Sequence, residues 1–99
     1  MTFALPVERL CETPCLLAFE HPSPAYPVHI LLVPKKPLAS FAELNPAADM
    51  DFLVDLAGTV QKLVRQFNLE AVGYRLIVNG GPYQEFPFLH FHLISELSM

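Results

Sequence analysis

The chain has 99 residues, of which 53% are hydrophobic and only 16% are charged. This length supports one domain with one modest core, and the apolar content excludes an intrinsically disordered chain. The net charge of −4, with six lysines and arginines, argues against a protein that binds the backbone of a nucleic-acid polymer. A small nucleotide, by contrast, needs no basic face. The apolar fraction also suggests that a partner subunit covers part of the surface.

The sequence indicates neither export nor membrane insertion. Residues 1–6 lack the charged segment and the long apolar run of a signal peptide. No apolar stretch approaches the roughly 20 residues that span a bilayer. We therefore expect a cytoplasmic protein without membrane contact. The spacing of Cys11 and Cys15 fits neither a C-x-x-C redox motif nor a usual zinc site, so we interpret both as reduced thiols.

The N-terminal half predicts strands joined by a stiff loop. Residues 7–13 could form a short strand, and the apolar residues 15–19 are typical of a strand that is buried on both faces. Three prolines within residues 21–27 exclude helix and central strand alike. Residues 28–33 form the best strand of this half, and residues 40–44 favour a short turn of helix.

The middle of the chain predicts one long amphipathic helix. Asn45 and Pro46 indicate its start, as the N-cap and the first helical residue. Asn68 is a suitable stop. Gly58 costs about 1 kcal/mol relative to alanine inside a helix, which suggests close packing at that point. Apolar residues recur at spacings of three and four, as one buried helix face requires: Phe52, Leu53, Leu56, Val60, Leu63, Val64 and Phe67.

The C-terminal part predicts two further strands around a turn. Residues 72–79 form the first strand, residues 80–83 carry a strong turn signal, and residues 88–94 form the second strand. Because side chains alternate along a strand, Leu89, Phe91 and Leu93 should face a core. Phe88, His90 and His92 should then share the other face, with the two imidazoles roughly 7 Å apart.

Together these elements predict a single α+β domain over residues 1–99. It would contain about five strands in a mainly antiparallel sheet, one long helix and a short helical turn. The sequence shows no repeat, low-complexity segment or internal linker.

Four stretches give the chain a resemblance to the histidine-triad (HIT) superfamily. They are residues 29–36 (HILLVPKK), residues 74–81 (YRLIVNGG), Gln84, and residues 89–93 (LHFHL). The ordered set covers roughly residues 15–95 and is most similar to the branch of small nucleotide phosphoramidases and their bacterial relatives. The resemblance implies a HIT-like fold and a homodimer that forms through the long helix and an adjoining strand.

The family motif, His-φ-His-φ-His-φ-φ with φ apolar, places its histidine positions on Phe88, His90 and His92. The resemblance implies that His90 is the nucleophile, which attacks the α-phosphorus of a nucleotide conjugate and forms a covalent nucleotidyl-His90 intermediate that water releases. In the family, a backbone carbonyl of the motif fixes the tautomer of this imidazole. The resemblance places three residues on the phosphate and one close behind the active site: His92, Gln84 and Asn79, and His29 respectively.

The chain departs from the family pattern at several positions. Phe88 replaces the first histidine and leaves a dyad. The acid that grips the ribose hydroxyls in the family falls at His21, and Glu20 could substitute only if the strand shifts. The segment 79–84 is about two residues short. Glu85 stands where a serine or threonine contacts the leaving group, and a carboxylate beside a phosphate is unfavourable by charge.

Three functions stay open on the sequence. The first is a nucleotidyl hydrolase or transferase that acts on a nucleotide-type small molecule without a metal or another cofactor. The second is a nucleotide- or phosphate-binding HIT module with impaired catalysis. The third is a metal-binding protein in which the His-x-His pair gains a third ligand from His29, His21 or Glu96. We expect His21 itself to face solvent, because it lies beside a proline in a loop.

Overall fold

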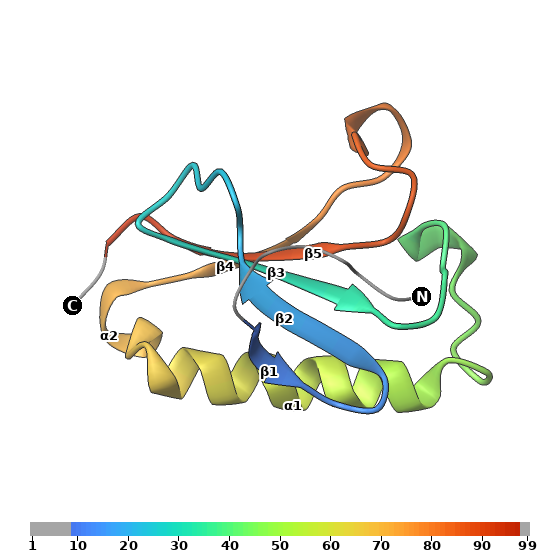
Figure 1. The fold of residues 1–99 in the computed structure, drawn as a ribbon, viewed down its shortest axis with the longest axis horizontal. Coiled ribbons are helices and arrows are strands. Elements are labelled where there is room, and N and C mark those ends of the chain that lie inside the picture. The colour runs from blue at the N-terminus through green and yellow to red at the C-terminus, as the bar shows by residue number, and fades with distance from the viewer. Residues whose placement is uncertain (1–8, 98–99) are drawn as a thin grey trace.

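The computed structural model describes residues 9–97. These residues form a five-stranded sheet with a long helix against one face (Figure 1). The order across the sheet is β1-β2-β3-β5-β4, and every neighbouring pair is antiparallel. The predicted α+β class with a five-stranded antiparallel sheet is therefore confirmed. The strands are β1 (Arg9–Glu12), β2 (Leu16–Glu20), β3 (Val28–Pro34), β4 (Arg75–Val78) and β5 (Phe91–Ser95).

One long and three short helical elements accompany the sheet. They are η1 (Phe41–Glu43), α1 (Met50–Gln66), α2 (Leu69–Val72) and η2 (Gly81–Tyr83). The predicted long helix and the predicted turn over residues 40–44 are both present. The short helix α2 was not predicted, because its apolar residues merge with those of the following strand in the sequence. Within residues 9–97, no helix is long and apolar enough to cross a membrane.

The start of α1 differs from the prediction. The Asn45 side-chain oxygen does accept two backbone N–H groups, at 3.1 and 3.3 Å, but these belong to a separate turn that precedes the helix. The helix begins at Met50 with Asp49 as its N-cap. The Asp49 carboxylate accepts the Asn45 N–H at 3.0 Å. The predicted stop is confirmed: Asn68 adopts the left-handed conformation (φ 56°) that ends many helices.

The main core lies between α1 and the sheet. The predicted alternation in the last strand is confirmed on this side, because Leu89, Phe91 and Leu93 are all buried there. The apolar stripe of α1 supplies the other half of the core through Phe52, Leu56, Leu63 and Val64. The opposite face of the sheet carries a smaller apolar cluster of Leu17, Phe19 and Val33 together with His29 and His92. This second face holds the candidate site.

The expectation of close packing at Gly58 was wrong. It is exposed on α1, and a Cβ atom placed on it would meet nothing within 4 Å. No neighbouring group of the described chain therefore packs closely against Gly58. Gly73 is different, because its φ of 95° and ψ of 149° lie in a region that is essentially restricted to glycine. This backbone conformation separates α2 from β4.

We expect Gly58→Ala to raise the free energy of unfolding by about 1 kcal/mol, because alanine restricts the unfolded chain and meets no obstacle in the helix. Gly73→Ala should lower it by about 1–3 kcal/mol through backbone strain. Urea denaturation followed by circular dichroism measures both changes. A loss of stability in Gly58→Ala would contradict the open environment seen at that position.

Candidate active site

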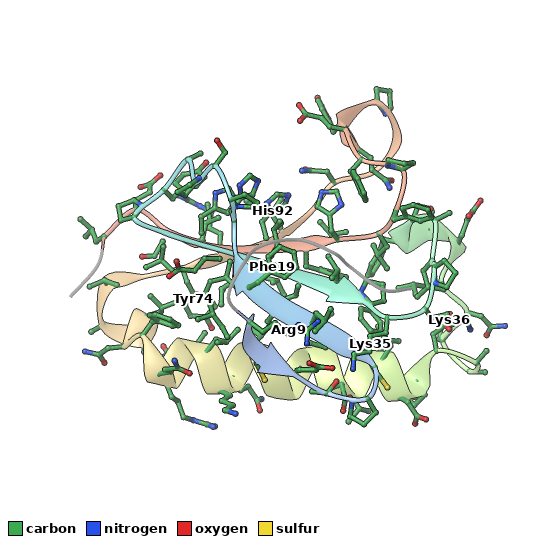
Figure 2. The ribbon with its side chains drawn as sticks, viewed as in Figure 1. Arg9, Phe19, Lys35, Lys36, Tyr74 and His92 are labelled. Atoms are coloured by element: carbon green, nitrogen blue, oxygen red, sulfur yellow. The ribbon has the colours of Figure 1, made fainter. Side chains whose placement is uncertain are left out.

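A cavity of about 680 Å³ opens on the sheet face opposite α1, and all four histidines of the chain line it. Its floor is formed by β3, β4 and β5. Two loops, residues 21–27 and 79–90, rise on that side of the sheet (Figure 1), and His92 projects between them (Figure 2). The wall further includes Tyr26, Asn79, Tyr83, Glu85 and Phe86.

The strand register brings His29 and His92 together. His92 on β5 is opposite Leu31 on β3, and His29 is opposite Ile94. His29 and His92 are therefore diagonal neighbours on one face, close enough for long side chains to meet. Their rings do meet, with 2.9 Å between His29 Nε2 and His92 Nδ1. His29 is 9% exposed, so most of its side chain lies beneath the cavity surface.

His90 lies immediately before β5 and bonds to the backbone. Its Nδ1 is 2.9 Å from the carbonyl oxygen of Phe88. The His90 and His92 ring centroids are 5.0 Å apart and the ring planes meet at 68°. The predicted spacing of roughly 7 Å assumed a regular strand. It is too long, because the strand begins only at Phe91.

The hydrogen-bond partners fix the tautomers of these rings. The Ala25 backbone N–H can only donate, so His29 Nδ1 accepts at 3.1 Å and the proton of neutral His29 is on Nε2. This proton is donated to His92 Nδ1, which leaves the His92 proton on Nε2. The Phe88 carbonyl can only accept, so His90 Nδ1 donates and His90 Nε2 keeps its lone pair. His90 therefore presents a lone pair on Nε2, whereas the adjacent His92 presents an N–H donor on Nε2.

Burial keeps the inner pair of imidazoles neutral. The pKa of His92 falls from 6.5 to about 4, first because burial disfavours the cation and then because three other imidazoles, on His90, His29 and His21, lie nearby. Burial and the neighbouring His21 also lower the pKa of His29. Neutral rings at both positions are what the hydrogen bond between them requires.

His21 belongs to the same cluster, which corrects the expectation that it faces solvent. Its ring is half-buried, and its centroid lies 4.4 Å from that of His29 and 6.2 Å from that of His92. His21 Nδ1 accepts the Ser23 N–H at 2.9 Å. A signal for this placement was available, because an antiparallel pairing of residues 16–20 with the next strand puts residue 21 beside His29. The His21 N–H indeed donates to the His29 carbonyl at 2.8 Å.

The other residues expected on the phosphate lie in different surroundings. Asn79 lines the cavity just beyond the end of β4. Gln84 does not line it: its amide nitrogen donates to the carbonyls of Ala39 at 2.8 Å and Phe86 at 3.0 Å. This side chain ties the loop 79–90 to the segment after β3. Phosphate contact by Gln84 stays a prediction.

Phe88 also differs from its predicted position. It lies in a bend before β5, half-buried, and its ring packs against that of Phe86 with centroids 5.8 Å apart. The ring is absent from the cavity lining, so Phe88 does not share the face of the two motif histidines. Its contribution to the site is its carbonyl oxygen.

The cluster is not arranged as a metal centre. Among residues 9–97, no group of three or more histidine, cysteine or carboxylate side chains has the geometry to hold a metal ion. Glu96, considered as a third ligand for the His-x-His pair, instead forms an ion pair with Arg75 at 3.2 Å. Both ring nitrogens of His29 and one of His92 are engaged in hydrogen bonds.

The fold and the site define a class of small α+β proteins that present an imidazole lone pair and an imidazole N–H group in one cavity. The sequence matches the HIT domain family over residues 3–99. The chain belongs to this family. The departure at Phe88 leaves the family fold intact.

Comparison with individual relatives supports the same family. A HIT-like protein of Rickettsia prowazekii is 32% identical over 92 residues, which cover 93% of this chain and 77% of the relative. One from Synechococcus elongatus is 36% identical over 97 residues, or 96% and 83% of the two chains. The crystal structure of a HIT family hydrolase from Legionella pneumophila superposes with a TM-score of 0.85 at 31% identity, over 96% of this chain and 86% of that one.

A second solved structure bears on ligand binding. The histidine triad nucleotide-binding protein from Candida albicans matches with a TM-score of 0.77 at 28% identity, over 90% of this chain and 65% of that chain.

His29 is expected to set the tautomer of His92. In long-range ¹H–¹⁵N spectra, His92 should be protonated on Nε2 and His90 on Nδ1 at neutral pH. His29→Leu removes the donor, so His92 should populate both tautomers. Its pKa should rise above about 4, because the loss of this hydrogen bond destabilises the neutral ring, but the burial that lowers the pKa most remains. His29→Gln carries an amide donor at a similar reach and should restore the wild-type pattern. An unchanged His92 spectrum in His29→Leu would contradict this role.

The depressed pKa of His92 also predicts how stability depends on pH. Between pH 6.5 and about 4, His92 binds a proton in the unfolded chain but not in the folded protein. The free energy of unfolding should therefore fall as the pH is lowered through this window. Glu12 and Asp49, whose pKa values lie below their ordinary 4.5 and 3.8, lose their contributions only at lower pH. Urea denaturation at about pH 7 and about pH 5 should show a drop that is smaller in His92→Asn. Equal drops in both proteins would contradict the assignment to His92.

Proposed function

We propose that this protein is a nucleotide-binding hydrolase or nucleotidyl transferase that cleaves the bond between the α-phosphate of a nucleotide conjugate and its leaving group. One observation carries the proposal: His90 presents an Nε2 lone pair beside the Nε2–H group of His92. A phosphate needs this combination, because the lone pair attacks phosphorus while the donor neutralises a non-bridging oxygen.

The first step forms the covalent intermediate. The His90 Nε2 lone pair makes a bond to phosphorus, and the bond from phosphorus to the leaving-group nitrogen or oxygen breaks. The departing atom keeps that electron pair and takes a proton from water. The resulting nucleotidyl-imidazole is cationic, and its Nδ1–H continues to donate to the Phe88 carbonyl. This bond is stronger to the charged ring than to the neutral one, so it favours the intermediate.

The second step restores the enzyme. Water attacks phosphorus, the bond from phosphorus to His90 Nε2 breaks, and the electron pair returns to the ring. The products are a nucleoside monophosphate and one proton released to solvent. An acceptor alcohol or amine in place of water would make the reaction a transfer.

The remaining side chains act by binding and orientation. His92 donates a hydrogen bond but supplies no net proton, because its Nδ1 already accepts from His29 and the neutral ring would have to become an anion. His29 is a positioning residue that acts through His92. Asn79 lies in the cavity wall at the end of β4, where its amide can donate to a phosphate oxygen.

Three supporting observations concern the ligand and the setting. A structure similar to this one bears the name of a histidine triad nucleotide-binding protein, and another that of a HIT family hydrolase. The cavity volume of about 680 Å³ falls in the range of small-molecule sites. We further propose that the protein is cytoplasmic and forms a homodimer. The dimer is supported by Leu76 on the edge strand β4 and Val54 on α1, which are 44% and 62% exposed, because burying apolar side chains in an interface is favourable.

The reaction can be tested with an adenosine 5′-phosphoramidate. Wild-type protein should release AMP, and acid-quenched samples should show the mass of one adenylyl group on His90. His90→Ala should lower kcat/KM by at least about 1,000-fold, because it removes the nucleophile. His92→Asn should lower it by about 100-fold, because it alters a donor to the developing charge.

The circular dichroism spectrum of each variant controls for folding. AMP release by His90→Ala at the wild-type rate, or wild-type protein that binds the nucleotide without cleaving it, would refute the proposed reaction.

A further inference from the structure

The charge of the cavity wall is unusual for a phosphate site. With the histidines counted as neutral, Glu85 is the one residue within 9–97 that lines the cavity and carries a formal charge. None of the six basic side chains of the chain lines the cavity. Four of them are in ion pairs elsewhere: Arg9 and Lys35 with Glu12, Lys36 with Asp49, and Arg75 with Glu96.

The positions of these groups confirm the separation. Figure 2 shows Arg9, Lys35 and Lys36 apart from His92, near β1 and the ends of the neighbouring strands. The other two basic residues, Lys62 and Arg65, lie on α1, which covers the opposite face. A polyphosphate in the cavity would therefore meet a carboxylate and no neutralising cation, which is unfavourable by charge.

Exposed aromatic rings flank Glu85. Tyr83 is 82% exposed and Phe86 is 50% exposed, although both line the cavity. The Phe86 ring centroid lies 6.0 Å from that of His90, so this rim adjoins the reacting centre. Glu85 makes no ion pair with any residue in the range 9–97. We call Tyr83, Glu85 and Phe86 the acidic aromatic rim.

The rim is held in place. Gln84, in its middle, donates to the Ala39 and Phe86 carbonyls, and the Leu89 N–H donates to the Leu38 carbonyl at 2.8 Å. The bonds to Ala39 and Leu38 tie the loop that carries the rim to the segment after β3. A carboxylate that neighbours two exposed aromatic residues along this loop is suited to an ammonium group, which a carboxylate attracts and an aromatic face also binds.

We propose that the acidic aromatic rim selects substrates whose phosphorus substituent on that side carries a protonated amine. In this arrangement, a phosphate bound by His90 and His92 has one substituent on the side of loop 21–27 and another on the side of loop 79–90. The substituent on the side of loop 79–90 lies near Glu85 and carries the positive charge. Resting on the proposed function, this assigns the substrate class as nucleoside phosphoramidates of diamines or basic amino acids. Within this class, the ammonium group also offsets the repulsion between Glu85 and the phosphate.

Two matched adenosine 5′-phosphoramidates test the assignment. One carries a 5-aminopentyl group and the other a hexyl group, so the chains have the same length and differ in the terminal ammonium. Wild-type protein should favour the aminopentyl compound in kcat/KM by roughly five- to thirtyfold, from one exposed charge pair and one cation–π contact. Glu85→Gln should bring the ratio close to one, and Glu85→Lys should invert it.

A matched control separates a local charge from net charge. Glu70→Gln removes the same charge from α2, whose residues lie outside the cavity lining. It should keep the wild-type preference. Phe86→Leu should reduce the preference while retaining the sign, because it removes the ring and leaves the carboxylate. A wild-type ratio near one, or a ratio that Glu70→Gln and Glu85→Gln change equally, would overturn the proposal.

Binding distinguishes this proposal from the proposed reaction. The His90→Asn variant lacks the nucleophile, so calorimetry can measure the affinity of both compounds without turnover. A preference for the ammonium compound that Glu85→Gln abolishes supports the rim even if the wild-type protein cleaves neither compound. Cleavage of both at equal rates, with equal affinities, would refute the rim and leave the reaction standing. Absence of binding by either compound would refute both.

Discussion

The chemistry of the site depends on where two backbone groups place protons. The Ala25 N–H bonds to His29 Nδ1, which places the His29 proton on Nε2 and the His92 proton on Nε2 in turn. The Phe88 carbonyl holds the His90 proton on Nδ1. Without these contacts, each imidazole could present either a lone pair or a donor. With them, the pair presents one lone pair and one N–H donor, the asymmetry on which the proposed phosphate binding rests. The asymmetry comes from the fold, because both controlling groups are main-chain atoms.

This dependence explains how the site accommodates Phe88. A histidine side chain at this position would face the loop, while the carbonyl that orients His90 is available from any residue. What must be preserved is the backbone path from the bend into β5, together with the pairing of β3 and β5 that makes His29 and His92 diagonal neighbours. A slip of one residue in that pairing would send the His92 ring to the helix side and separate the two rings. The main core opposes such a slip, because Leu93 and Ile30 are buried opposite each other on the helix side.

The sequence made part of this arrangement predictable. The alternation around His90 and His92, the long helix and the succession of strands and helix along the chain all follow from hydrophobic periodicity, and the alternation places the two histidines on the face opposite the core. The order of the strands in the sheet was not predicted. The tautomer of His92 was beyond reach, since it depends through His29 on the Ala25 N–H, and the small apolar side chain of Ala25 carries no chemical signal. For His90, the family resemblance had implied a backbone carbonyl as the partner that fixes the tautomer. The role of Gln84 was hidden for a similar reason: its partners are carbonyls at residues 39 and 86, which any sequence would supply. The prediction that Asn45 caps the long helix was wrong, because the short turn that its side chain closes precedes the helix, which begins at Met50.

The cavity combines four imidazole rings with the negative charge of Glu85, and this combination limits what it can bind. A basic pocket would hold phosphates indiscriminately and would keep the product monophosphate bound. In the proposed complex, imidazole and amide donors hold the anion through hydrogen bonds that are individually modest, so affinity would come largely from the groups on either side of the phosphate. Those groups would contact His21 and Tyr26 on one side and the acidic aromatic rim on the other, all of which line the cavity. Once the bond to phosphorus breaks in the proposed reaction, the negatively charged monophosphate is left facing Glu85. A carboxylate that selects substrates by their ammonium group would therefore also favour release of the product.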